Sequence, residues 1–498
     1  MLDKVLAINN INFLFVIIGF ILTTLSLLSS YNYINTNKKW YYLIHITYII
    51  GFSLVILTQK WIILLVGWEI VTLATALMLI WSSNRLAWQY FMIQFFGSSI
   101  LLYAVLTAIS LGYPQISPIQ ETWLQNLLII GLGMKNAIFG FHFWLPPVHT
   151  RAPFPVSAIL SGWVVKLGFI VYLKIIPDGN NLLLWLGILM IFFGGIKALL
   201  ATDYKVLLAY STISQLGYIA VGIGIGSVYS IAGSIIHIIA HGFAKTGLFI
   251  GSGYITKEYG TRSIYKIKDA WKKLSFTSIT ILFSFASLMG LPLLAGYNSK
   301  YLIKLGVKEI PFFTIILYGA SLLTVFYSIR TLWLVILKDI IKQVNFNLIS
   351  KNFKFHNSEV ETHKWLSLLP VILILPVLGI FPSLIVQFEE FHLLNGIRNN
   401  IIYILLVILI LQKFDWFKIE EKEAPSLDRI FKNIYELCQS LSTKSIQYNT
   451  ESFFENHLYR LIYKGARLLH NIIYSDFQSQ LLWIPIVLFV LLLWITIV

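Results

Sequence analysis

The chain has 498 residues, of which 57% are hydrophobic and only 12% are charged. Soluble domains carry about 25% charged residues, so this composition excludes a surface that mainly faces water. The net charge of +15 would suggest nucleic-acid binding in a soluble protein. Here the basic residues gather in short connections and tails, which is typical of loops beside anionic lipid headgroups. We therefore expect a lipid bilayer and no nucleic acid as partner.

Long uncharged stretches recur along the chain. Residues 11–30 contain no charged side chain, and twenty residues suffice to cross a hydrocarbon core of about 30 Å. Because similar stretches follow, we interpret the first one as a membrane span and not as a cleaved signal peptide. The sequence predicts an all-α polytopic membrane protein of about fourteen transmembrane helices. The expected spans are 11–30, 41–59, 62–81, 90–112, 124–145, 154–176, 182–200, 206–225, 229–255, 274–303, 310–338, 365–387, 398–412 and 479–498.

Two predicted spans contain breaks. Residues 144–155 read WLPPVHTRAPFP and residues 290–296 read GLPLLAG. One continuous helix cannot hold four prolines in twelve positions. Irregular backbone at membrane depth is tolerated only inside protein or beside a water-filled cavity. The residues expected in the two broken-helix loops are Pro146, Pro147, Pro153, Pro155, Gly290, Pro292 and Gly296.

The two breaks fall in the fifth and tenth predicted spans. Breaks at matching places in two halves are typical of transporters built from inverted repeats. The alternative is that the prolines only kink packed helices. The spacing predicts two inverted five-helix repeats. The expected segments are an N-terminal span (1–40), a first repeat (41–176), a second repeat (182–338), a loop with additional spans (339–412), an amphipathic lateral segment (413–478) and an anchor span (479–498).

The stretch 427–475 has a different pattern. It lacks proline and carries an apolar residue at every third or fourth position, which predicts an amphipathic helix. Such a helix cannot span; it should lie along the membrane or along neighbouring helices. If continuous, it would be about 70 Å long, although the polar residues 442–452 favour two helices. We expect it to act as a strap in assembly.

Five charged residues stand in apolar surroundings. Glu69 is the one acidic residue inside a long apolar span, and a carboxylate at the bilayer centre costs several kcal/mol, so we expect it to be functional. The alternative is a protonated glutamate that bonds a neighbouring helix. The lysines of this kind are Lys135, Lys166, Lys245 and Lys300. A lysine near a span end can instead extend to the headgroups, an alternative that is strongest for Lys300.

Three titratable residues follow one another at intervals of four. His237, His241 and Lys245 therefore lie near one face of a helix, about 6 Å apart along its axis. This line predicts a proton relay. A zinc site is the alternative, because two histidines four apart can bind zinc, but no third ligand is evident and we expect no metal.

Other chemistry is not indicated. The single cysteine, Cys438, excludes a disulfide framework or a cysteine-ligated iron–sulfur centre within the chain. No glycine-rich phosphate loop occurs. We expect no cofactor and no redox or hydrolytic centre in this chain. Burial favours the neutral form of a lysine, whereas a nearby carboxylate favours the charged form. Moving Glu69 relative to Lys135 would therefore change proton occupancy, as coupled transport requires.

Six motifs between residues 40 and 340 resemble one known family. They are GWE at 67–69, the lysine at 135, FHFWLPPVHTRAPFPVSAILSG at 141–162 with Lys166 following, ATDYKVLLAYSTISQLGY at 201–218, HIIAHGFAK at 237–245 and GLPLLAGYNSK at 290–300. In this order and spacing the chain resembles the antiporter-like subunits of respiratory complex I, of Mrp-type sodium/proton antiporters and of membrane-bound energy-converting hydrogenases. Within this family the chain most resembles the largest antiporter-like subunit of complex I and its hydrogenase counterpart, with which it shares histidines before Lys245, Lys300 after the second break and the amphipathic tail with its last span.

The resemblance implies roles for these residues. Glu69 would pair with Lys135 in a first half-channel, Lys166 and His241 would carry protons along a central axis, and Lys245 and Lys300 would belong to a second half-channel. The implied partners are other membrane subunits and transported H+ or Na+. The implied location is a bacterial or archaeal cell membrane or the inner mitochondrial membrane, and the chain would be the proton-pumping subunit of a quinone oxidoreductase-like translocase.

The chain also departs from the family pattern. It begins about two spans late, reads LPPVHTRAP where an acidic LPDAH-like sequence is common, and has Lys197 where a small apolar residue is usual. Two alternatives therefore stay open: an ion-translocating partner that energises uptake of another solute such as inorganic carbon, and a scaffold that does not transport. The charged residues listed above argue against the scaffold.

Overall fold

The computed structural model describes residues 11–268, 270–337 and 362–385. Every regular element in these ranges is a helix, as the sequence predicts. The spans predicted at 398–412 and 479–498 and the amphipathic stretch 427–475 lie outside the described residues. So does the predicted loop 339–364, except for its last three residues, which begin α17.

Ten helices of the described part are long and apolar enough to cross a membrane. Nine of them are α1 (Ile11–Ser30), α2 (Lys38–Leu57), α3 (Trp61–Leu79), α4 (Asn84–Ser110), α9 (Asn181–Leu200), α10 (Tyr204–Ile225), α11 (Val228–Tyr259), α15 (Pro311–Leu332) and α17 (Thr362–Ile380). The tenth is the stretch Phe154–Ile175, which consists of two short helices and the turn between them. The shorter helices are α5 (Thr122–Gly133), α6 (Leu145–Arg151), α7 (Phe154–Gly162), α8 (Leu167–Ile175), α12 (Ala270–Lys273), α13 (Ser275–Met289) and α14 (Ala295–Leu305). Short 3-10 or π turns are η2 (His142–Trp144), η3 (Val164–Lys166), η4 (Trp333–Leu337) and η6 (Pro382–Leu384).

Polar residues in the connections define where several helices begin and end. The Asn180 side chain accepts a hydrogen bond from Leu183 N at the start of α9, and Asp203 does the same for α10. Such N-caps satisfy amide groups that a first helical turn leaves unpaired. Gly226 and Gly260, both with positive φ, end α10 and α11 in the left-handed conformation that glycine tolerates best.

The first helix break lies earlier than the prolines predict. The backbone leaves the helix after α5, and residues 134–141 form turns in which Ala137 and Gly140 have positive φ. The chain is interrupted within 144–155, as predicted, but most of this stretch is helical and not a loop. Pro146 and Pro147 stand in the first turn of α6, and Pro155 stands in the first turn of α7, where the missing amide N–H costs little. Only Ala152 and Pro153 separate those two helices.

The second break agrees more closely with the sequence. Gly290 ends α13 with φ 83°, Pro292 lies in the connection, and α14 begins at Ala295, so that Gly296 is already helical. Leu293 has φ 69°, a strained conformation for a side chain of its size. A further interruption was not predicted: α7 and α8 are separated at Trp163 and η3.

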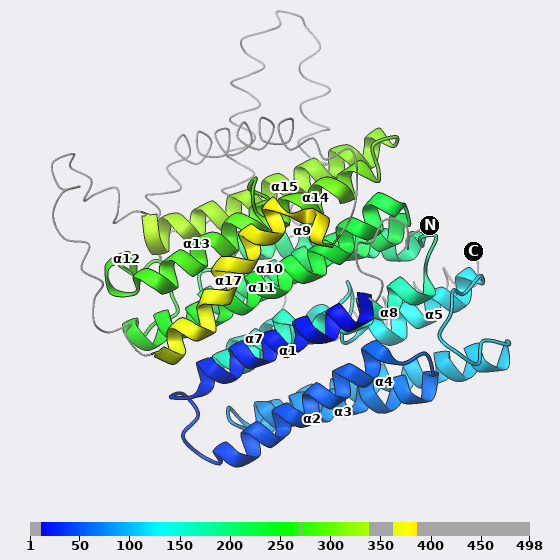
Figure 1. The fold of residues 1–498 in the computed structure, drawn as a ribbon, viewed down its shortest axis with the longest axis horizontal. Helices are drawn as coiled ribbons and strands as arrows, with labels where there is room; N and C mark the ends of the chain where they lie inside the picture. The colour runs from blue at the N-terminus through cyan, green and yellow to red at the C-terminus, as the bar shows by residue number, and fades with distance from the viewer. Residues whose placement is uncertain (1–10, 269, 338–361, 386–498) are drawn as a thin grey trace, which may run out of the picture.

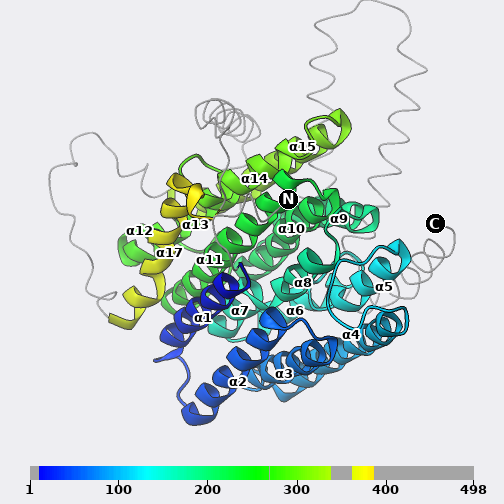
Figure 2. The same ribbon diagram turned by 45° about the vertical axis from the view of Figure 1, so that its right-hand side comes forward.

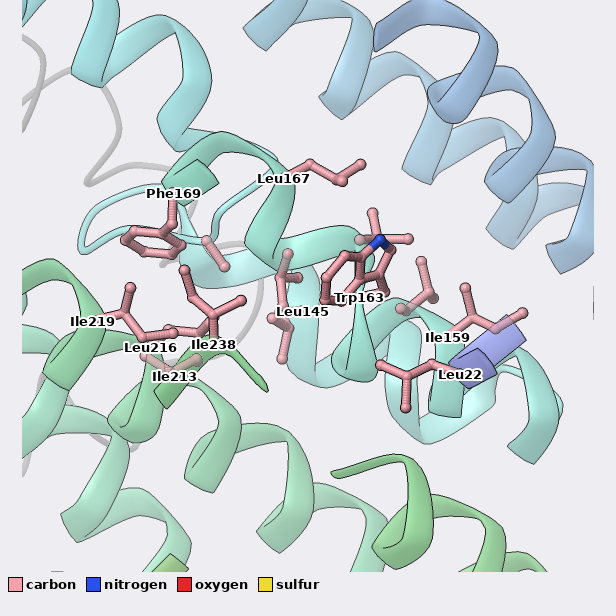
Figure 3. Close-up of a cluster of buried hydrophobic side chains, with 14 of the residues drawn as sticks. Leu22, Leu145, Ile159, Trp163, Leu167, Phe169, Ile213, Leu216, Ile219 and Ile238 are labelled. Atoms are coloured by element: carbon pink, nitrogen blue, oxygen red, sulfur yellow. The ribbon is translucent and has the colours of Figure 1, made fainter. Parts of the chain in front are cut away.

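Helix α11 is the centre of the bundle. It packs against α1, α7, α10, α13, α14 and α17, and its apolar stretch is entirely buried. Figures 1 and 2 show α2, α3 and α4 at one edge of the molecule and α13, α14, α15 and α17 at the opposite edge. The apolar side chains in Figure 3 come from the helices between these edges: Leu145, Phe169, Ile213, Leu216, Ile219 and Ile238 gather where α6 and α8 meet α10 and α11. The halves of the molecule thus share one core.

Candidate functional site

Lys135 lies inside the first break and contacts α3. Its side chain is 1% exposed. Its Nζ donates to Trp68 O at 2.9 Å and to Thr72 Oγ1 at 2.7 Å, and it lies 4.2 Å from the centroid of the Trp68 ring. The turns that end α5 free this lysine to reach a neighbouring helix. Lys135 is therefore held by a carbonyl, a hydroxyl and an aromatic ring.

Glu69 stands on the same turn of α3. It follows Trp68 directly and is half-buried. Its carboxylate interacts electrostatically with the Lys135 amine. No ion pair within 4.0 Å joins the two side chains, both of which belong to the described part. The structure thus places Lys135 against the turn of α3 that carries Glu69, but the two side chains do not form a direct ion pair.

Lys166 lies in the second interruption of the first half, at η3. It is completely buried, and its Nζ donates to Ser161 O at 2.6 Å. Asn136, the neighbour of Lys135, accepts a hydrogen bond from Gly168 N at 3.0 Å. An amide side chain therefore joins the break that holds Lys135 to the backbone just beyond Lys166.

Lys245 lies on α11 and contacts α10. Its Nζ donates to Leu208 O at 3.0 Å and to Ser211 Oγ. The next residue of α10, Thr212, forms a 2.8 Å hydrogen bond with Ser161, the residue whose carbonyl accepts from Lys166. Hydroxyl groups therefore line the space between the two lysines.

His241 and His237 continue this line along α11. Their rings stack at 6.0 Å, and both side chains are buried. The charges of Lys166 and Lys245 act on His241. His237 Nδ1 lies 2.8 Å from Ser299 Oγ on α14, and Ser299 precedes Lys300.

Lys300 ends the line on α14. Its Nζ donates to Leu288 O in the last turn of α13 at 2.6 Å and lies 4.4 Å from the centroid of the Tyr218 ring. The same Tyr218 ring lies 5.8 Å from the His237 ring. Lys304, one turn further on, is the charged side chain that acts on Lys300. Lys300 is buried, so extension to the headgroups does not describe it.

Several polar residues of this region do not stand out in the sequence. Thr72, Ser161, Ser211 and Ser299 bond the lysines and His237, and Asn136 and Thr212 bond residues next to them, yet single hydroxyl and amide residues are common in apolar helices. His149 was also missed. It is buried on α6, stacks on Phe249 at 4.7 Å and is acted on by Lys166, Lys205 and Lys245. Its place in the HTRAP stretch could have identified it.

Polar atoms without a protein partner cluster along the same line. Within the described residues they include both ring nitrogens of His149 and His241 and Oε1 of Gln215. Buried polar groups are rarely left unsatisfied, and ordered water is their usual partner. No three His, Cys, Asp or Glu side chains gather as metal ligands in the part of the chain that the structure describes. The line is suited to exchange of protons between amines, imidazoles, hydroxyls and water.

Comparison with known proteins shows which family this chain belongs to. The model of the NADH:quinone oxidoreductase/Mrp antiporter transmembrane family matches residues 58–326, more than half of the chain. The chain is 32% identical over 217 residues to NADH-quinone oxidoreductase subunit N of Desulforudis audaxviator, covering 41% of this chain and 43% of the relative. It is 31% identical over 227 residues to subunit M of Pseudomonas aeruginosa, covering 44% of each.

The alignments thus span less than half the length of these two relatives. Among solved structures, a chain of the Mrp complex from Dietzia sp. has the same fold, with a TM-score of 0.67, 21% identity, and coverage of 98% of this chain and 55% of that chain. The long apolar helices and the family match agree on a membrane-embedded protein. This chain belongs to the transmembrane family of NADH:quinone oxidoreductase and Mrp antiporter subunits.

Proposed function

We propose that this chain translocates protons, or sodium ions in exchange for protons, as the antiporter-like subunit of a multisubunit membrane assembly of the complex I or Mrp type. The residues that carry the ion would be Glu69, Lys135, Lys166, His237, His241, Lys245 and Lys300. The relatives named above belong to such oxidoreductases by name, and the shared family supports the same role here.

One observation supports this proposal above the others. Helix α11 lies at the centre of the bundle, and His237, His241 and Lys245 on it are each at most 1% exposed. Isolated buried charges are expensive, so such groups persist in membrane proteins where an ion path needs them. A scaffold would have no use for them.

The geometry suggests how a proton would move. Amines and imidazoles would hold it, and the hydroxyls of Ser211, Thr212 and Ser299 are hydrogen-bonded to Lys245, Ser161 and His237 respectively. A charge arriving at Lys166 raises the cost of a charge at Lys245 or His241, since these groups interact electrostatically. Occupancy at one site therefore displaces a proton from the next.

The architecture proposed for the whole chain extends the described part. It comprises about fourteen spans, with two inverted five-helix repeats over 41–176 and 182–338 that each contain a broken helix. The matching breaks of α5–α6 and α13–α14 support the repeats. We further propose that 413–478 straps neighbouring subunits and that 479–498 anchors it.

The test uses the intact assembly reconstituted into liposomes. Lys245→Met should lower proton flux per assembled complex by at least about tenfold, because it removes the central titratable amine. Lys174→Met is the matched control: Lys174 is a partly buried lysine that donates to Ile56 O at 2.6 Å, away from α11. Normal flux with Lys245→Met, measured with a pH-sensitive dye inside the liposomes, would contradict the proposal.

A further inference from the structure

A basic cavity opens on one face of the molecule, beside the α6–α7, α9–α10 and α11–α12 connections. Its volume is about 690 Å³. Five basic side chains and one acidic side chain belong to its lining: Arg151, Lys205, Lys257, Arg262, Lys266 and Asp203. None of these residues is part of the proposed ion path.

Hydrogen bonds to the backbone fix the walls of this basic cavity. Arg262 Nη1 donates to Thr150 O at 2.6 Å, and Lys205 Nζ donates to Ala152 O at 2.7 Å. Tyr204 N donates to Arg262 O at 2.8 Å. These bonds tie the α11–α12 and α9–α10 connections to each other and to the α6–α7 connection. The cavity is therefore formed by the fold itself.

The one carboxylate of the lining is already bonded on both oxygens. Asp203 Oδ1 accepts from Lys205 N at 2.8 Å and from Val206 N at 3.2 Å. Its Oδ2 lies 2.9 Å from Arg262 Nε, in an ion pair. Five basic side chains against one acidic side chain give the lining a net charge of +4. The lining thus calls for a negative ligand.

The excess of positive charge continues into the protein. Lys205 is only 7% exposed. Three lysines act electrostatically on the buried His149 ring: Lys205, Lys245 and Lys166. Like charges repel each other strongly in a medium of low dielectric constant. An anion beside Lys205 would therefore lower the free energy of a cluster that has several cations and one carboxylate.

The cavity also offers room and a polar group for a ligand. Arg151 and Lys257 are exposed at its rim. Within the described residues, Ser263 Oγ is buried without a protein partner. A Cβ atom added at Gly260 would meet open space. Arginine, lysine and hydroxyl donors together are the groups that bind phosphate oxygens, through short charge-assisted hydrogen bonds.

The cavity lies on the basic face of the molecule. Tyr33 of the α1–α2 connection belongs to its lining, and Ser82 of the α3–α4 connection donates to Arg151 O at 2.7 Å. The basic residues next to these two connections are Lys38, Lys39 and Arg85. Basic connections are typical of the cytoplasmic or matrix side, where the lipid surface is anionic.

We propose that this cavity is a binding site for a phosphate group, carried by inorganic phosphate or by an anionic phospholipid headgroup. Arg151 and Lys257 donate to the phosphate oxygens from the rim, and Ser263 donates from the wall. Lys205 and Arg262 contribute their charge while they keep their bonds to the backbone. The site goes beyond the proposed function, because binding of this ligand requires no ion transport.

The first test measures binding of inorganic phosphate to the intact assembly in detergent by isothermal titration calorimetry, with chloride keeping the ionic strength constant. The double variant Arg151→Gln/Lys257→Gln should lower the affinity at least about tenfold, because two charge-assisted hydrogen bonds are lost. Lys60→Gln/Lys308→Gln is the matched control. It removes the same charge from two exposed lysines outside the lining and should bind like the wild type.

The second test places the same variants in nanodiscs and measures retention of phosphatidylglycerol against phosphatidylcholine by native mass spectrometry. A loss confined to inorganic phosphate identifies the free anion as the ligand, and a loss confined to phosphatidylglycerol identifies the lipid. Equal binding of both probes by the Arg151→Gln/Lys257→Gln variant and the wild type would overturn the site. Binding of neither probe by the wild type would overturn it too.

These outcomes are independent of the proposed function. The melting temperature of each assembly shows whether a variant is folded, and neither binding measurement uses transport. A failed site would leave the flux expected of the wild type and of Lys245→Met unchanged. Normal flux in Lys245→Met would contradict the proposed function and leave the phosphate site standing.

Discussion

The two helix breaks hold their lysines in different ways. Lys135 contacts a helix turn that carries a carboxylate, Glu69, and its own bonds go to Trp68 and Thr72. Lys300 bonds a carbonyl of the preceding helix and lies over Tyr218, and the charge that acts on it is that of another lysine, Lys304. Both lysines are buried, so the difference lies in what compensates the charge. Each lysine bonds a backbone carbonyl and lies over an aromatic ring, and only Lys135 has a side-chain anion nearby as well.

The largest effect is expected from removing the anion. Glu69→Gln should lower ion flux at least about tenfold, because an unpaired charge on Lys135 costs several kcal/mol in apolar surroundings. Glu258→Gln is the control, since Glu258 pairs with Lys273 at 3.8 Å near the end of α11. The two variants are compared by their ion flux per assembled complex. If Glu69→Gln transported normally, the two breaks would not differ in the way described.

A smaller effect should separate the aromatic rings. Tyr218→Leu should lower flux more than Trp68→Leu, by several-fold against about twofold, because a ring contributes about 2 kcal/mol to a desolvated cation and Lys135 has Glu69 in addition. Tyr218→Phe keeps the ring and serves as the control. Equal effects of the two leucine variants would mean that Glu69 does not support Lys135.

The smallest effect concerns the backbone at the second break. Leu293 has φ 69° and is half exposed, so Leu293→Gly should raise the free energy of unfolding by about 1 kcal/mol by relieving the left-handed strain. Ala158→Gly in α7, where the backbone is helical, should lower it by a similar amount. Thermal melting in detergent measures both. A lower melting temperature for Leu293→Gly would show that its side chain, and not its backbone, governs the break.

The sequence predicts the long helices well and the breaks less well. The span predicted at 182–200 appears as Asn181–Leu200, because a nearly continuous apolar run begins just after the polar N-cap Asn180. The first break begins earlier than predicted, after Gly133, because prolines were taken to mark it. Proline marks a helix start equally well, and the residues that do break the helix, around Ala137 and Gly140, have no such signature.

The candidate site, too, was predicted from the sequence only in part. Charged residues such as Lys135 and Lys245 are easily recognised within apolar sequence segments, because burying a charge in a membrane costs free energy and therefore indicates a function. Their partners Thr72 and Ser211 do not, since a hydroxyl in a helix can bond its own backbone and needs no further role. Which hydroxyls face a lysine depends on how helices distant in sequence pack, and the spacing of residues contains no such information.

Two of the lysines donate hydrogen bonds to the C-terminal ends of helices. Lys166 donates to Ser161 O in the last turn of α7, and Lys300 donates to Leu288 O in the last turn of α13. A cation at this place satisfies a carbonyl and compensates the negative end of the helix dipole. Losing a proton would weaken that bond, because hydrogen bonds from charged donors are roughly twice as strong as neutral ones. The winding of the two helix ends would then report whether the proton is present, which converts a chemical event into a mechanical one.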